Sequence, residues 1–186
     1  YGLPVLLSGL ASLVLSKVEL AALDHHYTVS LEQLMRLYPR TPASMVYLMA
    51  GCLPASATLH ERQLCLLGMI ARQGPTAILH RWGTYLLTNP PPPTRSPSSV
   101  PWFLQVRQLC IQYHLPDPLE VLTSAPTKGS WKSKMKRQVA EYWVPRSEQR
   151  HSPSHLIQEQ EGKDIPKEVM CHLTRTWLYQ LQRARF

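Results

Sequence analysis

The sequence predicts an all-α fold, an irregular multi-helix assembly with a Pro-rich linker and a poorly ordered C-terminal tail. Apolar residues recur every three or four positions in several stretches, which is typical of amphipathic helices. No stretch shows an equally regular alternation that would indicate strands. The 186 residues include 17 Pro but only 8 Gly, so prolines separate short helices and few tight hairpins are available. We divide the chain into four regions, residues 1–88, 89–100, 101–143 and 144–186.

Two capping-box patterns predict helix starts in the first region, at Ser30–Gln33 and at Thr58–Glu61. In this pattern a hydroxyl caps the helix and a Gln or Glu three residues later reaches back to it. The first helix should end before Pro39, and the second should cover residues 59–73 and stop at Gly74. Shorter helices are expected over residues 42–49 and 82–87.

The linker is the segment 89–99, which holds five Pro and three Ser and cannot pack a core. We interpret it as a spacer, and the alternative is a ligand for a polyproline-binding domain. Pro101 then suits the first turn of a helix. One face of that helix should carry Trp102, Val106, Leu109 and Tyr113, and a short helix over 119–122 should follow.

The stretch 131–143 places four cations within six residues and aromatic residues at both ends. Trp131, Met135, Val139 and Tyr142 share one helical stripe. Lys132, Lys134, Lys136 and Arg137 lie off that stripe. The pattern predicts an amphipathic helix whose apolar face docks and whose basic surface remains exposed.

Residues 145–165 are polar and show no periodicity, so we expect them to be loose. A terminal helix over 167–185 is suggested by apolar residues spaced by three and four.

The apolar segment Leu3–Leu15 is too short to span a bilayer as a helix. It lacks the basic lead of a secretory signal, although its central region resembles one. We favour a buried segment that continues from sequence upstream, because the chain begins at Tyr1 and reads as a fragment. No membrane partner is expected.

The formal net charge is +8 and the pI is about 9.5. Residues 128–150 alone hold seven cations and two acids. Such a balance favours a polyanionic partner, and the alternative is that it serves only solubility.

Catalytic and metal-binding patterns are scarce. The four cysteines are at least thirteen positions apart, and no C-x-x-C, G-x-S-x-G, H-E-x-x-H or Gly-rich phosphate loop occurs. Cys110 and His114 stand at i and i+4 and could share a metal, but no second pair lies near them in the sequence. We therefore expect no catalytic residue, no metal and no cofactor in this chain.

Nucleic-acid binding is the function that the residues favour, because Lys and Arg gain affinity for phosphate by releasing counterions. The alternative for each cation is a solvated helix face, and the alternative for each tryptophan, which could stack on a base, is a place in the core. Arg107 could contact phosphate or lie over an aromatic ring. The candidate residues are Lys132, Lys134, Lys136, Arg137, Trp131, Trp143 and Arg107.

Several short sequence words occur in a familiar order. They are Tyr1–Pro4, Leu37–Pro39, Thr41–Pro42, Gly51–Pro54, His60–Leu64, Trp102–Phe103 with Gln105 and Arg107, Tyr113 with Leu115–Pro116 and Pro118–Leu119, and Tyr142–Trp143. Together they resemble the region after the reverse transcriptase domain in polyproteins of vertebrate, particularly fish, non-LTR LINE-type retrotransposons. The resemblance covers about residues 1–143, and the chain departs from the family pattern after Trp143.

The resemblance implies a helical, non-catalytic region that helps to hold RNA or DNA and supports an upstream polymerase domain. It implies that the parent polyprotein is an RNA-directed DNA polymerase with an endonuclease, and that it works in the cytoplasm and nucleus. The polymerase aspartates are not in this chain, whose three Asp residues are never adjacent: Asp24, Asp117 and Asp164. The alternative function is a helical protein-interaction module that does not bind nucleic acid.

Overall fold

The structure is a computed structural model that describes residue 7 and residues 9–38, 41–92 and 100–149, with only the backbone given for residues 144–149. The predicted terminal helix over 167–185 and most of the predicted loose segment lie outside this part of the chain. The described residues confirm the all-α prediction, since they contain helices and no strand. The elements are η1 (Leu10–Ser12), α2 (Lys17–Met35), α3 (Ala43–Ala50), α4 (Ala55–Gln73), α5 (Ile78–Thr88), α6 (Trp102–Gln112), α7 (Pro118–Ser124) and α8 (Lys128–Gln149).

The chain divides into two compact units. Unit 1 comprises residues 1–25 and 55–143, and unit 2 comprises residues 26–54 and 144–186. Residues on both sides of the Pro-rich segment therefore belong to unit 1. The part of that segment that the structure describes, residues 89–92 and 100, has no regular helix.

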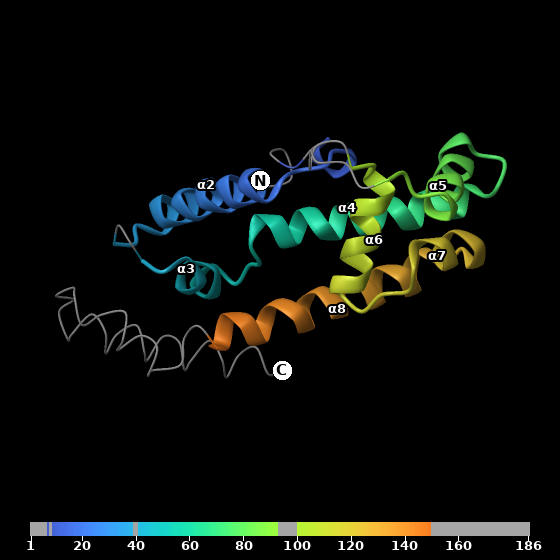
Figure 1. Cartoon of the computed structure of the whole chain (residues 1–186). Coiled ribbons are helices and arrows are strands. Elements are labelled where there is room, and N and C mark those ends of the chain that lie inside the picture. The colour runs from blue at the N-terminus through green and yellow to red at the C-terminus, as the bar shows by residue number, and fades with distance from the viewer. Residues whose placement is uncertain (1–6, 8, 39–40, 93–99, 150–186) are drawn as a thin grey trace. The chain divides into compact units, whose positions relative to one another are not determined.

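Unit 1 is organised around α4, whose buried side chains include Leu59, Leu64, Leu67 and Ile70. Figure 1 shows α6 crossing α4, with α5 and α7 near the carboxyl end of α4 and α8 lying along it. Side chains of this core, among them Gln105, which donates to the carbonyl of Leu15 at 3.5 Å, hold the N-terminal segment. The Trp102 indole N–H donates to the carbonyl of Ala11 at 2.8 Å, and the Gln63 amide donates to the carbonyl of Leu13 at 3.0 Å.

Helix α2 begins at a capping box that the sequence analysis missed. Ser16 N–H donates to the Glu19 carboxylate at 2.7 Å, and Glu19 N–H donates to the Ser16 hydroxyl at 3.3 Å. The hydrogen bond from the Ser16 backbone lowers the pKa of Glu19. The predicted start at Ser30 is wrong, because Ser30 lies inside α2 and its hydroxyl donates to the carbonyl of His26.

Helix α4 also starts earlier than predicted, at Ala55 instead of Leu59. Its first turn is capped from another helix: Asp24 of α2 accepts both the backbone N–H of Ser56, at 2.8 Å, and the Ser56 hydroxyl, at 2.7 Å. An anion suits this position because the first N–H groups of a helix have no partner within it. The end of α4 is as predicted, with Gly74 in the left-handed region at φ 81°.

The other helices differ from prediction mainly at their ends. Helices α3, α6 and α7 lie where short helices were expected, whereas α5 is about a turn longer at its start than the predicted 82–87. Helix α8 begins at Lys128 and continues through Pro145 to Gln149, so residues 145–149, which were expected to be loose, are helical.

In unit 2, the second half of α2 packs on α3 through aromatic and hydroxyl groups. The rings of Tyr27 and Tyr47 stack with centroids 6.1 Å apart, and the Thr28 and Tyr47 hydroxyls are 2.7 Å apart. The Tyr27 hydroxyl also donates to the Cys52 thiol at 3.6 Å. Burial is the main cause that raises the pKa of Tyr27 above its ordinary value.

Candidate nucleic-acid interface

The apolar stripe of α8 packs into unit 1, as predicted, although its last member, Tyr142, is only partly buried. Trp131, Met135 and Val139 are each at most 3% exposed. The indole N–H of Trp131 donates to the backbone carbonyl of Leu64 at 2.9 Å. Trp131 is thus a core residue with its polar group satisfied, and it cannot stack on a nucleic-acid base.

Gly68 of α4 makes this contact possible. A Cβ at that position would lie 2.6 Å from Nε1 of Trp131, which is closer than real side chains approach. Gly68 follows Leu64 by four residues, so it lies one turn along the same face of α4 and leaves the Leu64 carbonyl open to the indole. A small residue on α4 and a large one on α8 fix the two helices together.

The contacts along α8 show that it runs antiparallel to α4. Trp131 contacts Gly68, and the Met135 sulfur lies 3.8 Å from the Cys65 thiol. Further along α8, Trp143 contacts the Tyr113 hydroxyl, which also contacts His60 of α4. Positions on α8 therefore increase while positions on α4 decrease. This alignment decides which face of α4 lies beside each flank of α8.

The four candidate cations on α8, Lys132, Lys134, Lys136 and Arg137, are all exposed, but they do not form one surface. With about 100° between successive residues, Lys132 and Lys136 lie on one flank of the buried stripe, while Lys134 and Arg137 lie on the other. The sequence analysis expected these cations to form a single basic surface. That expectation is wrong, because they form two separate pairs.

The pair Lys132 and Lys136 faces α4. Both lysines, together with Arg72 of α4, act to lower the pKa of the Cys65 thiol, but burial and then the Glu61 carboxylate raise it by more. Burial likewise raises the pKa of Glu61, against the influence of Lys136. Lys132 and Lys136 of α8 and Arg72 of α4 thus all lie near Cys65, beside Glu61, and we call these three cations the α4–α8 basic cluster. Its member Arg72 was not among the residues chosen from the sequence.

The other pair is partly compensated within α8. Arg137 Nε lies 3.8 Å from the Glu141 carboxylate, an exposed contact between residues four apart. Such exposed pairs contribute about 0.3–0.5 kcal/mol to a helix. Glu141 lies on the same flank of α8 as Lys134 and Arg137, so it lowers the positive potential there.

Trp143 is held in a chain of hydrogen bonds. Its indole N–H donates to the Tyr113 hydroxyl at 3.1 Å, and that hydroxyl lies 2.8 Å from Nδ1 of His60. Tyr113 is 1% exposed, and burial lowers the pKa of His60 to about 4. Neutral His60 can accept a hydrogen bond from the Tyr113 hydroxyl at Nδ1. The Tyr113 oxygen then accepts the hydrogen bond from the Trp143 indole N–H. Half-buried Trp143 therefore makes the last contact described between α8 and the core of unit 1.

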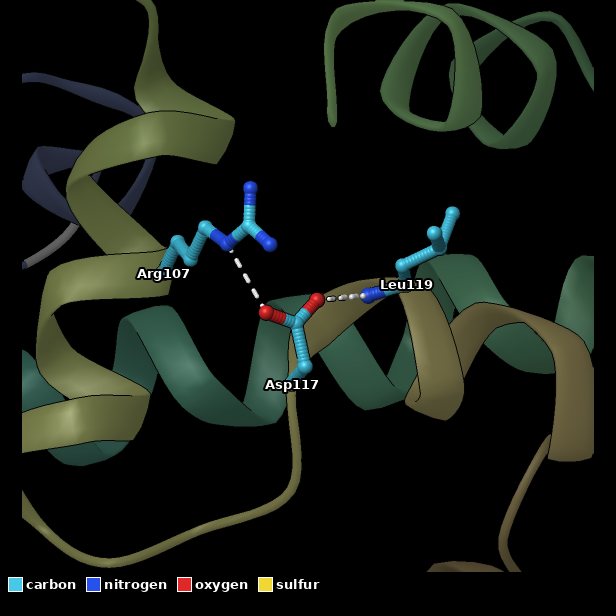
Figure 2. A network of polar contacts seen from close by, with 3 residues as sticks. All are labelled: Arg107, Asp117 and Leu119. Carbon is cyan, nitrogen blue, oxygen red and sulfur yellow. Dashed lines mark hydrogen bonds and ion pairs between the residues drawn. The ribbon is translucent and has the colours of Figure 1, made fainter. Parts of the chain in front are cut away.

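Arg107 has a structural partner. Figure 2 shows its guanidinium Nε donating to one carboxylate oxygen of Asp117 at 2.8 Å, while the other oxygen accepts the backbone N–H of Leu119 at 2.9 Å. Asp117 is the N-cap of α7, and Arg107 of α6 orients it. Both side chains are a little more than a third exposed, so the pair links α6 to α7 and leaves Arg107 with little freedom to follow a phosphate.

Cys110 and His114 do not form a metal site of the kind considered. Cys110 is buried in α6, and burial raises the pKa of its thiol to about 12. His114 lies past the end of α6 with φ 51°, so the helical i, i+4 relation does not hold for this pair. Within the described residues, no group of three or more His, Cys, Asp or Glu side chains could hold a metal.

Comparison with known proteins identifies no relative. No protein-family profile matches the chain, and no curated protein or solved structure is significantly similar to it. None of the helices in the described ranges combines the length and apolar character that crossing a membrane requires.

Proposed function

We propose that this chain is a non-catalytic nucleic-acid-binding region, and that the α4–α8 basic cluster holds the phosphate backbone. The observation that carries the proposal is the juxtaposition of exposed Lys132 and Lys136 with Arg72 on a neighbouring helix. Trp131 anchors α8 on α4, so the cations stand on a fixed support instead of a mobile arm.

The spacing of the two lysines suits a chain of phosphates. Lys132 and Lys136 are about 6 Å apart along the axis of α8, because each residue adds about 1.5 Å. Each phosphate that they neutralise releases counterions, and this supplies affinity without reading base sequence. The expected binding is strongly salt-dependent and indifferent to sequence.

The resemblance to the region after the reverse transcriptase of LINE-type retrotransposons supports the same role. In that setting the chain would hold template RNA or target DNA beside the polymerase, while the chemistry takes place in another part of the polyprotein. It would then act in the cytoplasm and nucleus, where that polyprotein meets RNA and chromosomal DNA.

Paired charge reversals test where the phosphates bind. K132E/K136E and K134E/R137E make the same change in net charge on opposite flanks of one helix. We expect the first variant to weaken binding of single-stranded RNA strongly and to reduce the slope of log affinity against log salt by about 1.4, as expected for two lost phosphate contacts. The second should have a much smaller effect, and filter binding across a salt series measures both.

Equal losses in the two variants would show that overall charge matters and the cluster does not. Unchanged affinity in K132E/K136E would reject the proposal. Circular dichroism should be the same for both variants and the wild type, because all four side chains are exposed.

A second candidate is the helical protein-interaction module. Two apolar side chains near the start of unit 1 favour it: Leu13 and Val18 are 50% and 78% exposed. They would suit docking against an upstream domain such as a polymerase. Fluorescence anisotropy with single-stranded RNA at low and physiological salt separates the candidates, since the module predicts no binding at either.

A further inference from the structure

Helix α5 is oriented opposite to what its composition suggests. Its buried face consists of His80, Gly83 and Leu87. The stripe Ile78, Trp82 and Tyr85 instead faces solvent, with exposed fractions of 83%, 54% and 58%. The largest aromatic side chains of the helix therefore lie outside the core.

Two contacts fix this orientation. The His80 ring N–H donates to the backbone carbonyl of Leu122 in α7 at 3.0 Å. Gly83 lies against the ring of Phe103 in α6, so closely that a Cβ there would be 2.5 Å from Cε1. Because His80 and Gly83 must face inward for these contacts, Trp82 and Tyr85 must face outward.

The two outward rings form an ordered pair. Trp82 and Tyr85 have centroids 5.9 Å apart and planes only 24° from parallel. Nearly parallel exposed rings provide a surface on which a further flat ring can stack. Exposed apolar residues scattered singly need no explanation, but a stacked Trp–Tyr pair on one stripe is a more specific feature.

Arginine is the predominant charged residue in the sequence around the pair, although α7, which packs against α5, carries the exposed acid Glu120. Arg81 is exposed beside the pair on α5. Residues 62–116, which include α5 and most of α4, hold five Arg and no Asp or Glu. The last turn of α4, which carries Arg72, leads through residues 74–77 directly into α5. An acidic partner with flat apolar rings complements this surface, and single-stranded nucleic acid has both properties.

We propose that Trp82 and Tyr85 stack on unpaired bases and that the ligand of this chain is single-stranded RNA or DNA. The inference rests on the proposed function and narrows its ligand class. A duplex keeps its bases stacked internally, so the pair gains nothing from it, whereas a single strand offers a free face on every base.

The test compares full-length wild type with two double variants. W82L/Y85L keeps apolar side chains on α5 but removes both rings. I78A/L79A removes apolar surface from the same helix and keeps the rings, so it is the matched control. The probes are an oligonucleotide on the order of a dozen nucleotides, as suits a single-strand site, the same backbone without bases, and the corresponding duplex.

We expect W82L/Y85L to bind the single strand at least about fivefold more weakly, since each stacked base contributes about 1–3 kcal/mol. Its affinity for the abasic strand and the duplex should equal that of the wild type, and I78A/L79A should resemble the wild type on every probe.

Unchanged binding of the single strand by W82L/Y85L, or equal binding by wild type of the strands with and without bases, overturns the inference but leaves phosphate binding intact. Loss in I78A/L79A as large as in W82L/Y85L would indicate a general apolar docking surface and overturn it too. Wild type that binds none of the three probes overturns both this inference and the proposed function.

Discussion

Helices α5 and α8 pack with opposite orientations of their aromatic residues, and a glycine accounts for each. In α8 the tryptophan lies inside, because the glycine that receives it, Gly68, belongs to α4. In α5 the glycine is its own, Gly83, and the aromatic ring that fills the space, Phe103, comes from α6. Helix α5, which supplies its own glycine, therefore turns its small face to the core, and its Trp82 and Tyr85 remain at the surface.

The same difference separates the two proposed contacts with nucleic acid. The α8 side offers charge on a rigid base, and the α5 side offers rings. Charge holds a polyanion at a distance and without regard to base, while rings require an unstacked base to be within contact. A ligand that uses both must be flexible enough to bend between them, which a single strand is.

The largest expected difference in stability is between the two tryptophan-to-alanine variants, one in α8 and one in α5. W131A removes a buried ring and leaves the Leu64 carbonyl without its indole partner, so we expect a loss of about 3–5 kcal/mol in the free energy of unfolding. W82A changes an exposed position and should stay within about 0.5 kcal/mol of wild type. Urea denaturation followed by circular dichroism measures both, and similar values for the two variants would contradict the comparison.

The buried end of the α8 interface should be sensitive to acid. His60 has a folded-state pKa of about 4 and an ordinary value of 6.5. The unfolded chain therefore binds the proton more readily, and stability should fall as the pH drops from about 6.5 to about 4 and then level off. The loss amounts to roughly 3 kcal/mol for a difference of this size.

The variant H60N provides the control, because an amide can occupy the place of Nδ1 without titrating in this range. Its stability should change less between pH 6.5 and pH 4 than that of wild type, as measured by urea titrations at each pH. An unchanged pH dependence would show that another group is responsible.

A smaller effect is expected from adding a methyl group at three helical glycines. G68A and G83A force the ring of Trp131 or Phe103 to move, at a cost of about 1–3 kcal/mol, which is partly offset by up to about 1 kcal/mol from the better helix propensity of Ala. Gly129, in the first turn of α8, has nothing within 4 Å of such a methyl group. G129A should therefore be neutral or slightly stabilising, and thermal denaturation should rank the three variants in this way. Stabilisation by G68A or G83A would mean that the rings are not held closely against the glycines.

Local signals account for much of the helical pattern. The stripe of α8 and the Gly74 stop of α4 follow from residues near in sequence, and both are observed. The start of α2 was also predictable, because Ser16 and Glu19 form the same capping box that was sought and placed instead at Ser30. The start of α4 was not, since its cap is the Asp24 carboxylate, 32 residues away from Ser56.

The candidate site residues also fall into those that local sequence predicts and those that depend on distant contacts. That Lys132, Lys134, Lys136 and Arg137 avoid the buried stripe could be deduced from a helical repeat, and so could their division between two flanks. The recruitment of Arg72 could not, because it depends on α8 lying antiparallel to α4. Trp131 was a candidate for stacking until the structure placed it at Leu64, and the exposed pair Trp82 and Tyr85 had no distinguishing local signal.

The sequence by itself determined an all-α chain with a positive charge, and it determined which residues share each helical face. Only the tertiary structure decided which face is buried. Periodicity is a property of neighbouring residues, whereas burial requires a partner surface of matching shape, and here that surface comes from a glycine or a ring far away in the chain. Trp131 meets its carbonyl acceptor 67 residues earlier, and that distant contact is what keeps its ring in the core.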